Sequence, residues 1–156
     1  MSPPTGLFLV CVSNHAESET AVRYGCSLAK KHNGRVAILY VLEPDEFRGL
    51  LTITDAIHDE KEANAQELLK KMADICHLYY EDMPLLLLKE GKLAEEIVHA
   101  ANQQSDTQMV ILGIREESDR APKLASRLAD KLGSELLAPI MMIPGNISQE
   151  KLDRLI

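Results

Sequence analysis

The stretch LFLVCV (residues 7–12) decides the fold class, because its apolar side chains do not alternate with polar ones. Such a run is typical of a strand buried on both faces, as in a parallel sheet covered by helices on each side. Runs of the same kind recur at residues 36–42, 84–88, 109–112 and 139–143. The chain therefore contains five candidates for buried parallel strands.

Helical patterns separate these strands. Apolar residues recur every three or four positions in the segments 17–33, 55–78, 93–101 and 124–132. The alternation of strands and helices predicts an α/β domain with a parallel sheet and right-handed crossovers.

The boundaries of this domain follow from the same pattern. Residues 1–146 hold all five strands, and residues 147–156 form a tail that can add a last turn of helix. Asn33-Gly34 predicts a left-handed end to the first helix. The conformation of residues 45–54 stays open, since they fit a loop or a helical lead-in equally well.

Composition excludes several classes of function. The chain has 156 residues and a net charge of −7, with no Trp and two Phe. An acidic chain with few aromatic rings lacks the basic face and the stacking groups that nucleic acids and anionic membranes require. No apolar run approaches the roughly 20 residues of a membrane span, and residues 1–6 show no basic region before an apolar stretch, so we expect no signal peptide. We expect a cytoplasmic protein that binds neither nucleic acid nor membrane.

The three cysteines carry no recognisable motif. Cys11, Cys26 and Cys76 are odd in number and form neither a CxxC pair nor a zinc spacing. Cys11 lies in an apolar run and Cys26 in a helical one, where a free cysteine behaves as a small hydrophobic residue. We expect none of the three to be functional.

Tests for catalytic and metal-binding motifs give negative results. The phrase EGKLAEE (90–96) lacks the hydroxyl residue and the first glycine of a P-loop, and no G-x-G-x-x-G follows any strand. His58 and Glu62 are four residues apart on a helix without a third ligand in the sequence, which is common on a solvated face. A triad of Ser126, His15 and Asp119 has no sharp nucleophile turn to support it. We expect neither a metal nor an enzyme.

Several phrases of the chain together resemble the universal stress protein family. FLVCVSNHAESETAVRYGCSLAKKHNGRVAILYVLEP (8–44) is similar to its first strand, helix and second strand. LLLKEGKLAEEIVHAA (86–101), VILG (110–113) and APIMMIP (138–144) resemble its third, fourth and fifth strands with their neighbouring turns. The resemblance implies a single three-layer sandwich with strand order 3-2-1-4-5 and helices on both faces. It also implies a ligand site beyond the carboxyl ends of strands 1 and 4.

The resemblance assigns the candidate binding residues. Family members that bind ATP carry Gly-x-x-Gly, nine residues, and then Gly-Ser or Gly-Thr after strand 4. Here Gly113 matches the first glycine, whereas Glu116 and the pair Ser126-Arg127 replace the others, and Ser13 replaces an acid after strand 1. The candidate site comprises Val12, Ser13, Asn14, Val41, Gly113, Arg115, Glu116, Ser126 and Arg127.

These replacements argue against the family's phosphate site. Glycine lets the backbone approach a phosphate and adopt φ > 0, and we expect φ > 0 at Gly113. A carboxylate at Glu116 would repel phosphate by about 4 kcal/mol at 4 Å and an effective dielectric of about 20. We therefore expect no cofactor. The alternative is ATP or AMP in a rebuilt site that uses Arg115 and Arg127, with at most slow ATPase activity.

The resulting hypothesis is a non-catalytic stress-response or regulatory protein that acts through homodimerisation and protein contacts. Dimerisation through Ile140–Ile143 is expected because the order 3-2-1-4-5 puts this uncharged, apolar strand at a sheet edge. The resemblance implies the same contact. The alternative is that Ile147, Leu152 and Leu155 of the tail cover this edge. A sensor of another small ligand is a third hypothesis, and the sequence names neither the partner nor the stress.

Overall fold

The computed structural model describes residues 5–43, 51–114, 120–131 and 133–156; for 51–55 and 120–123 it describes the backbone. Most of the segment 45–54 thus lies outside the described residues, although residues 51–54 belong to the helix that follows. Five strands form one parallel sheet in the order β3-β2-β1-β4-β5, as expected. They are β1 (Leu7–Val12), β2 (Arg35–Leu42), β3 (Leu85–Glu90), β4 (Thr107–Ile114) and β5 (Ile140–Pro144).

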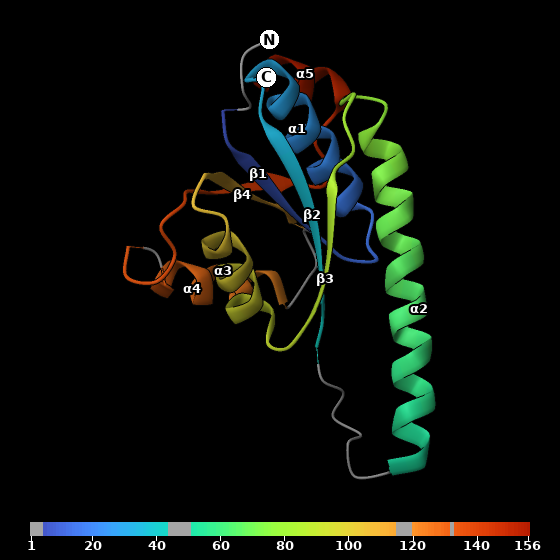
Figure 1. Cartoon of the computed structure of the whole chain (residues 1–156). Coiled ribbons are helices and arrows are strands. Elements are labelled where there is room, and N and C mark those ends of the chain that lie inside the picture. The colour runs from blue at the N-terminus through green and yellow to red at the C-terminus, as the bar shows by residue number, and fades with distance from the viewer. Residues whose placement is uncertain (1–4, 44–50, 115–119, 132) are drawn as a thin grey trace.

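Helices cover both faces of this sheet, which confirms the three-layer architecture (Figure 1). One face carries α1, α2 and α5, and the other carries α3 and α4. This division follows from right-handed crossovers, because the connections β1-α1-β2 and β2-α2-β3 run in one direction across the sheet and the later ones run back. The helices are α1 (Glu17–Lys31), α2 (Leu51–Cys76), α3 (Leu93–Gln103), α4 (Arg120–Lys131) and α5 (Gln149–Leu155).

The central strand β1 supplies side chains to two separate cores, which explains its unbroken apolar sequence. Phe8, Val10 and Val12 pack with α1, α2 and α5. Leu7, Leu9 and Cys11 face the opposite side and pack with α3 and α4. All six residues of β1 are buried. A polar residue at any of these positions would lose its hydration without gaining a partner.

The turn after α1 has the expected left-handed conformation. Asn33 has a φ of 54°, and the Gly34 N–H donates to the Ala29 carbonyl at 2.7 Å. A Cβ on Gly34 would lie 2.5 Å from a carbon of the Phe8 ring, so glycine is also needed there for packing. The Asn33-Gly34 signal is thereby confirmed.

The structure corrects the expectation for two cysteines. Cys26 of α1 and Cys76, the last residue of α2, form a disulfide, whereas Cys11 is free and buried on the other face of the sheet. The two helices lie side by side on one face and bring Cα atoms that are 50 residues apart to a distance of 5.8 Å. Spacing along the chain carries no signal for a bond of this kind, because the bond depends on helix packing.

The tail packs on the same face as α1. Leu152 of α5 is 1% exposed and joins the core cluster there, with Ile147 and Ile156 against it, while Leu155 is exposed. Arg23 of α1 donates to the Gln149 side chain at 3.1 Å. The tail is thus fixed to α1.

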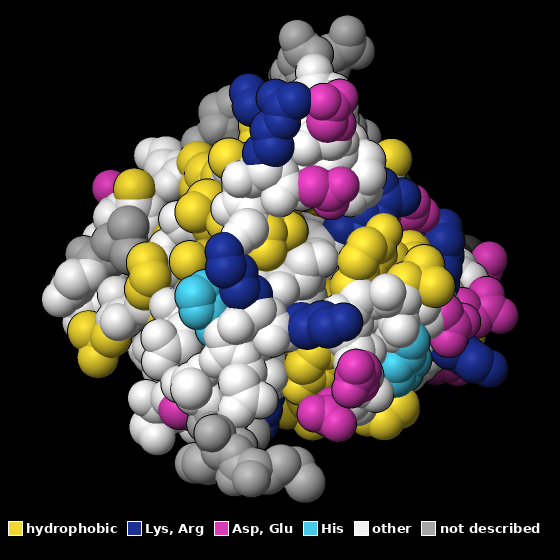
Figure 2. All heavy atoms as spheres, turned by 90° about the horizontal axis from the view of Figure 1, so that it is seen from above, with side chains coloured by type: hydrophobic (Ala, Val, Ile, Leu, Met, Phe, Trp, Pro, Cys, Tyr) yellow, Lys and Arg dark blue, Asp and Glu magenta, His cyan; other side chains and the backbone are white. Residues whose placement is uncertain are grey.

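Charges of both signs mix on the surface of the molecule seen from above, the end at which α5 lies in Figure 1. Figure 2 shows Lys and Arg side chains next to Asp and Glu side chains, with apolar groups between them. The described side chains of this face therefore form no continuous basic surface. Among the described residues, no helix is both long enough and apolar enough to cross a membrane.

Candidate functional site

The turn after β1 is held by a buried serine. The Ser13 N–H donates to the Ser18 Oγ at 2.7 Å, and the two hydroxyl oxygens are 3.2 Å apart. Ser18 is 2% exposed. The Ser13 hydroxyl, at the position where ATP-binding relatives are expected to carry an acid, is thus engaged within the protein. The sequence does not single out Ser18, because a serine in the first turn of a helix is an ordinary start signal.

The first turn of α1 rests directly on the end of β4. A Cβ on Gly113 would lie 2.7 Å from the carbonyl carbon of Glu17, and closer still to its oxygen. Gly145, just after β5, is equally close, since its Cβ would lie 2.5 Å from the Cβ of Glu17. Thr20 reinforces the contact by donating to the Gly145 carbonyl at 3.3 Å. Two glycines therefore make room for Glu17, which is 9% exposed.

This packing corrects the reason given for Gly113. The glycine is not among the described residues with positive φ, so the expectation of a left-handed conformation is wrong. Its lack of a side chain is instead required by the backbone of α1. A strand-end glycine of this kind has a packing role whether or not a ligand binds nearby.

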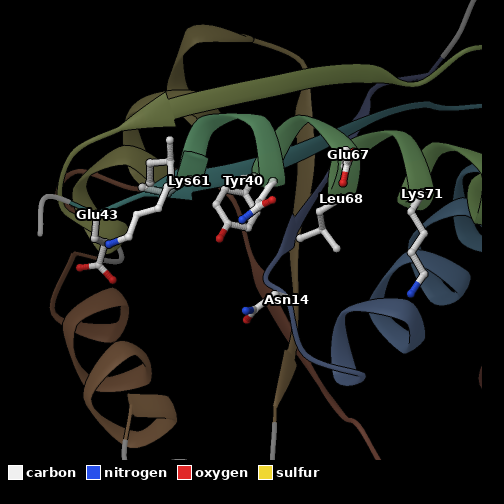
Figure 3. A pocket seen from close by; sticks show the side chains of 10 residues that line it. Asn14, Tyr40, Glu43, Lys61, Glu67, Leu68 and Lys71 are labelled. Atoms are coloured by element: carbon white, nitrogen blue, oxygen red, sulfur yellow. The ribbon is translucent and has the colours of Figure 1, made fainter. Parts of the chain in front are cut away.

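A cavity of about 640 Å³ lies at the carboxyl ends of β1 and β2, beneath α2. In Figure 3, Asn14 lies across the cavity from Tyr40 and Leu68, with Lys61 and Lys71 toward its two ends. The volume is within the range of small-molecule sites. The residues that line the cavity are Asn14, Tyr40, Val41, Leu42, Glu43, Lys61, Asn64, Glu67, Leu68 and Lys71.

The lining combines apolar walls with polar groups of both signs. Two lysines are balanced by two glutamates, and Lys71 also pairs with Glu19 of α1 at 3.0 Å. Amide side chains of Asn14 and Asn64 can both donate and accept hydrogen bonds. Such a site suits a small polar ligand with a flat apolar part better than a bare polyanion, which would require an excess of positive charge.

The structure brings two of the predicted site residues to this cavity. Asn14 and Val41 line it, whereas Val12, Ser13 and Gly113 lie at the neighbouring strand ends without lining it. This cavity lies at the carboxyl ends of β1 and β2 beneath α2, beside the position expected between strands 1 and 4.

The remaining predicted residues follow β4. Ser126 and Arg127 occupy exposed positions on α4 and are not among the lining residues. Arg115 and Glu116 lie outside the described residues. Of the two arginines in the alternative phosphate site, Arg115 and Arg127, only Arg127 is among the described residues.

The contribution of α2 to the cavity was not predicted from the sequence. Lys61 belongs to a charge run that reads as a solvated helix face, and Asn64 and Lys71 carry no motif. The length of α2 is the feature of the sequence that could have indicated its place beside the cavity. A helix of 26 residues that begins near the end of β2 must pass over the carboxyl end of the sheet.

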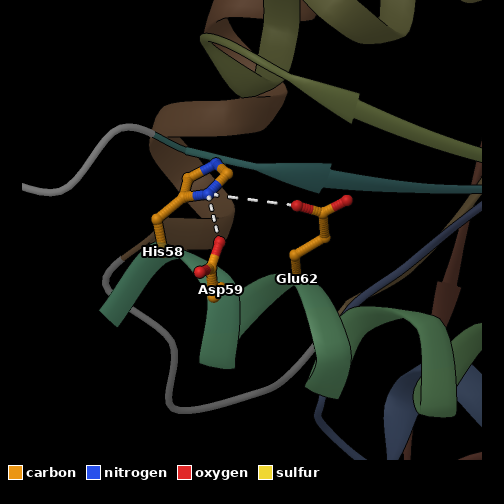
Figure 4. A group of neighbouring side chains, drawn as sticks. All are labelled: His58, Asp59 and Glu62. Atoms are coloured by element: carbon orange, nitrogen blue, oxygen red, sulfur yellow. Dashed lines mark ion pairs between the residues drawn. The ribbon is translucent and has the colours of Figure 1, made fainter. Parts of the chain in front are cut away.

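Beside the cavity, the imidazole of His58 is surrounded by carboxylates (Figure 4). Its Nδ1 lies 3.9 Å from both Asp59 Oδ1 and Glu62 Oε2, and its Nε2 lies 3.0 Å from Glu90 Oε1 at the end of β3. The hydrogen bond and the charge of Glu90 raise the pKa of His58 above its ordinary value. This pair ties α2 to β3.

The tie between His58 and Glu90 should respond to pH. Because the folded-state pKa is raised, the charged pair forms below that pKa and is lost as the pH rises through it. Replacement of Glu90 by Gln should bring the pKa back toward its ordinary value, and Glu62→Gln should do so less, since Glu62 is farther away. An NMR titration of the His58 ring protons measures both shifts. A pKa that Glu90→Gln leaves unchanged would contradict the assignment.

Comparison with protein families gives a direct match. The model of the universal stress protein family matches residues 7–144. The chain belongs to the universal stress protein family. The match spans all five strands, so it confirms the family that the sequence phrases resemble. A comparison with curated protein sequences gave no match.

Solved structures of universal stress proteins share the fold. UspA from Lactobacillus plantarum has a TM-score of 0.76 at 16% identity, covering 91% of this chain and 99% of its own. A universal stress protein in complex with cAMP has a TM-score of 0.68 at 11% identity, with 92% and 100% covered. One from Archaeoglobus fulgidus, in complex with dAMP, has a TM-score of 0.63 at 22% identity, with 88% and 97% covered.

Proposed function

We propose that this universal stress protein acts in the cytoplasm as a non-catalytic regulatory protein, through homodimerisation and contacts with a partner protein. The position of β5 at a sheet edge carries this proposal. Its residues Ile140, Met141 and Met142 are only partly buried, and none of the strand's residues is charged. An uncharged edge strand is a template for pairing with a second copy, and a two-fold axis satisfies both strands at once.

The packing of the tail supports a free edge. The buried side chain of α5, Leu152, points into the core shared with α1, and Gln149 and Ile156 contact Arg23 and Lys31 of α1. The Ile147 N–H donates to the Pro144 carbonyl at 3.2 Å, within the turn after β5. The tail is thus directed over a face of the sheet, which leaves Met142 available for a partner.

Substitution of Met142 by Lys should convert the dimer into a monomer, because each copy would bring a charge into the shared contact. Sedimentation equilibrium at tens of micromolar protein measures the mass, and circular dichroism confirms that the fold is kept. The matched control is Met83→Lys, since Met83 is 74% exposed and precedes the opposite edge strand. A monomeric wild-type protein, or a Met83→Lys variant that dissociates equally, would contradict the proposal.

A second candidate function is nucleotide binding, which the cavity beside Asn14 and Val41 favours. Relatives of the same fold were solved with cAMP and with dAMP. The amides of Asn14 and Asn64 offer hydrogen bonds to a base, and Leu42 and Leu68 offer apolar contact to its flat face. The absence of the family's second glycine and Gly-Ser pair from the sequence still argues against a triphosphate cradle.

Calorimetric titration with ATP, AMP and cAMP separates the two functions. Binding tighter than about 10 µM, equivalent to about 7 kcal/mol, would favour the nucleotide function. We expect Asn14→Ala to abolish such binding if the base occupies the cavity, whereas a loss in Arg127→Ala would indicate a phosphate site on α4. Absence of heat with all three nucleotides would leave the regulatory function as the supported one.

A further inference from the structure

The disulfide between Cys26 and Cys76 joins the middle of α1 to the last residue of α2. Both residues are completely buried, at 0% exposure. We propose that this pair is a redox-responsive clamp, which fixes the end of α2 to α1 when oxidised and releases it when reduced.

The cysteine pair fits this contact as a disulfide or as two thiols, and only the disulfide fixes the helix end covalently. The Cα separation of 5.8 Å is in the usual range for a disulfide, so the bond can form without movement of the backbone. Two thiols at these positions would be small apolar side chains in a core that includes Val22 and Met72. Cys11 lies on the opposite face of the sheet, and its thiol is kept neutral because burial raises its pKa. Exchange is therefore confined to one pair.

The remaining attachments of α2 are weaker than a covalent bond. Lys71 pairs with Glu19 at 3.0 Å, and His58 pairs with Glu90 at 3.0 Å, but these side chains are partly or largely exposed. Exposed ion pairs contribute little to stability because water screens them. Most side chains between residues 58 and 71 are exposed as well, whereas Leu69, Met72 and Ala73 are buried toward the cross-linked end. The cross-link is thus the strongest single attachment of this helix to α1.

The clamp has a direct effect on the cavity. Five of its lining residues lie on α2 between Lys61 and Lys71, and Cys76 follows less than two turns later. A helix held at this end presents a fixed wall to the cavity, whereas a released end allows the wall to move. Redox state would then set how firmly the cavity is formed, whichever ligand or partner it serves.

The exchange requires a low-molecular-weight thiol such as glutathione. Its thiolate attacks the sulfur of Cys76, the bond between the two cysteines breaks, and Cys26 leaves as a thiolate that takes up a proton. A second thiolate attacks the mixed disulfide, which releases Cys76 as a thiolate and yields glutathione disulfide. Cys76 then takes up a proton. Two electrons pass from two glutathione molecules to the protein, and glutathione disulfide reverses the reaction.

Burial of both sulfurs makes this exchange depend on opening of the helix end. The turn after α2 is fastened by Tyr80, whose hydroxyl donates to the Gly34 carbonyl at 3.1 Å. Tyr80 is 7% exposed, in the same core cluster as the cysteine pair. A thiol can reach the sulfurs only when this end opens. Disulfides of cytosolic proteins are usually transient and redox-linked. A reversible bond therefore agrees with the cytoplasmic location proposed above.

The first test measures both redox state and helix attachment. Full-length Cys11→Ala protein is equilibrated with mixtures of glutathione and glutathione disulfide, quenched, unfolded and labelled with a polyethylene glycol maleimide. We expect a reversible change from no label to two labels. Hydrogen exchange in the α2 segment 66–76 should be at least about tenfold faster in the reduced form, with α3 unchanged. A pair that stays oxidised in every mixture, or a reduced form with unchanged exchange in α2, would overturn the proposal.

The second test addresses the opening route. Tyr80→Phe removes one hydrogen bond and should raise the rate of reduction by excess glutathione about fivefold, the factor that corresponds to about 1 kcal/mol. Tyr79→Phe is the matched control, because Tyr79 is only partly buried and its hydroxyl has no hydrogen bond among those described. Equal rates in the two variants would overturn opening at the end of α2 as the step that admits the thiol.

Discussion

Reduction of the Cys26–Cys76 bond is expected to lower the free energy of unfolding by about 4 kcal/mol, because the bond closes a long loop in the unfolded chain. The two cysteines are 50 residues apart, and the entropy of the unfolded state rises when this loop is opened. At a slope of about 2 kcal/mol per molar urea, the unfolding midpoint should fall by about 2 M. Urea titrations of the oxidised protein and of the protein kept in reductant measure the difference.

Two variants separate the cross-link from the packing of the sulfur atoms. The double variant Cys26→Ala and Cys76→Ala should lose the stability of the bond and respond no further to reductant. Cys11→Ala removes a sulfur that is equally part of a core, and it should retain the full response to reductant. A wild-type protein whose midpoint is the same with and without reductant would contradict the presence of the bond.

Substitution of Gly113 by Ala is expected to lower the free energy of unfolding by about 3 kcal/mol, at the upper end of overpacking effects. The new Cβ would lie 2.7 Å from the carbonyl carbon of Glu17, which is backbone and cannot rotate away. The first turn of α1 would have to move off β4, and the hydrogen bond from Thr20 to Gly145 would weaken with it. Gly113→Val should be still more damaging.

The control for this prediction is Gly133→Ala. Gly133 has a φ of 84°, and a Cβ added to it would meet no described atom within 4 Å, so its substitution costs only conformational strain, about 1 kcal/mol. Chemical denaturation of both variants compares the cost of the steric clash at Gly113 with the cost of backbone strain at Gly133. A Gly113→Ala protein as stable as the wild type would show that the contact with Glu17 is looser than described.

The central strand was predictable because it is buried on both faces, whereas the edge strands β3 and β5 are apolar in sequence although most of their residues are partly buried or exposed. The apolar run of β1 indicates a sheet covered on two sides, and the structure divides that run between two cores. The strand order could not be predicted from periodicity, because periodicity does not show which strands lie next to each other. It came from the resemblance of several phrases, such as VILG (110–113), to one family.

The contacts between distant segments were not predictable. Cys26 and Cys76 meet because two helices pack side by side, and no local pattern specifies which faces touch. Gly113 was correctly singled out as a constrained position, but the reason given, a positive φ, was wrong. A side chain is excluded there because Glu17 at the start of α1 lies too close. A glycine in a sequence indicates a constraint without saying whether conformation or space imposes it.

The candidate site was predictable only at the strand ends. Asn14 and Val41 follow from the rule that ligands bind at the carboxyl ends of parallel strands. The other wall comes from α2, where Lys61 and Asn64 are ordinary residues of a solvated helix in the sequence. Their role depends on the path of the helix over the sheet.

The register of β1 also has a consequence for biosynthesis. Phe8 pairs with Val36 on one side and with Met109 on the other, so one neighbour of the central strand is made soon after it and the other much later. A nascent chain that has completed β3 therefore holds β1 with one row of backbone groups unpaired, and its side chains Leu7, Leu9 and Cys11 lack the cover of α3 and α4. This surface stays accessible to chaperones or to other nascent chains until α3, β4 and α4 have been made.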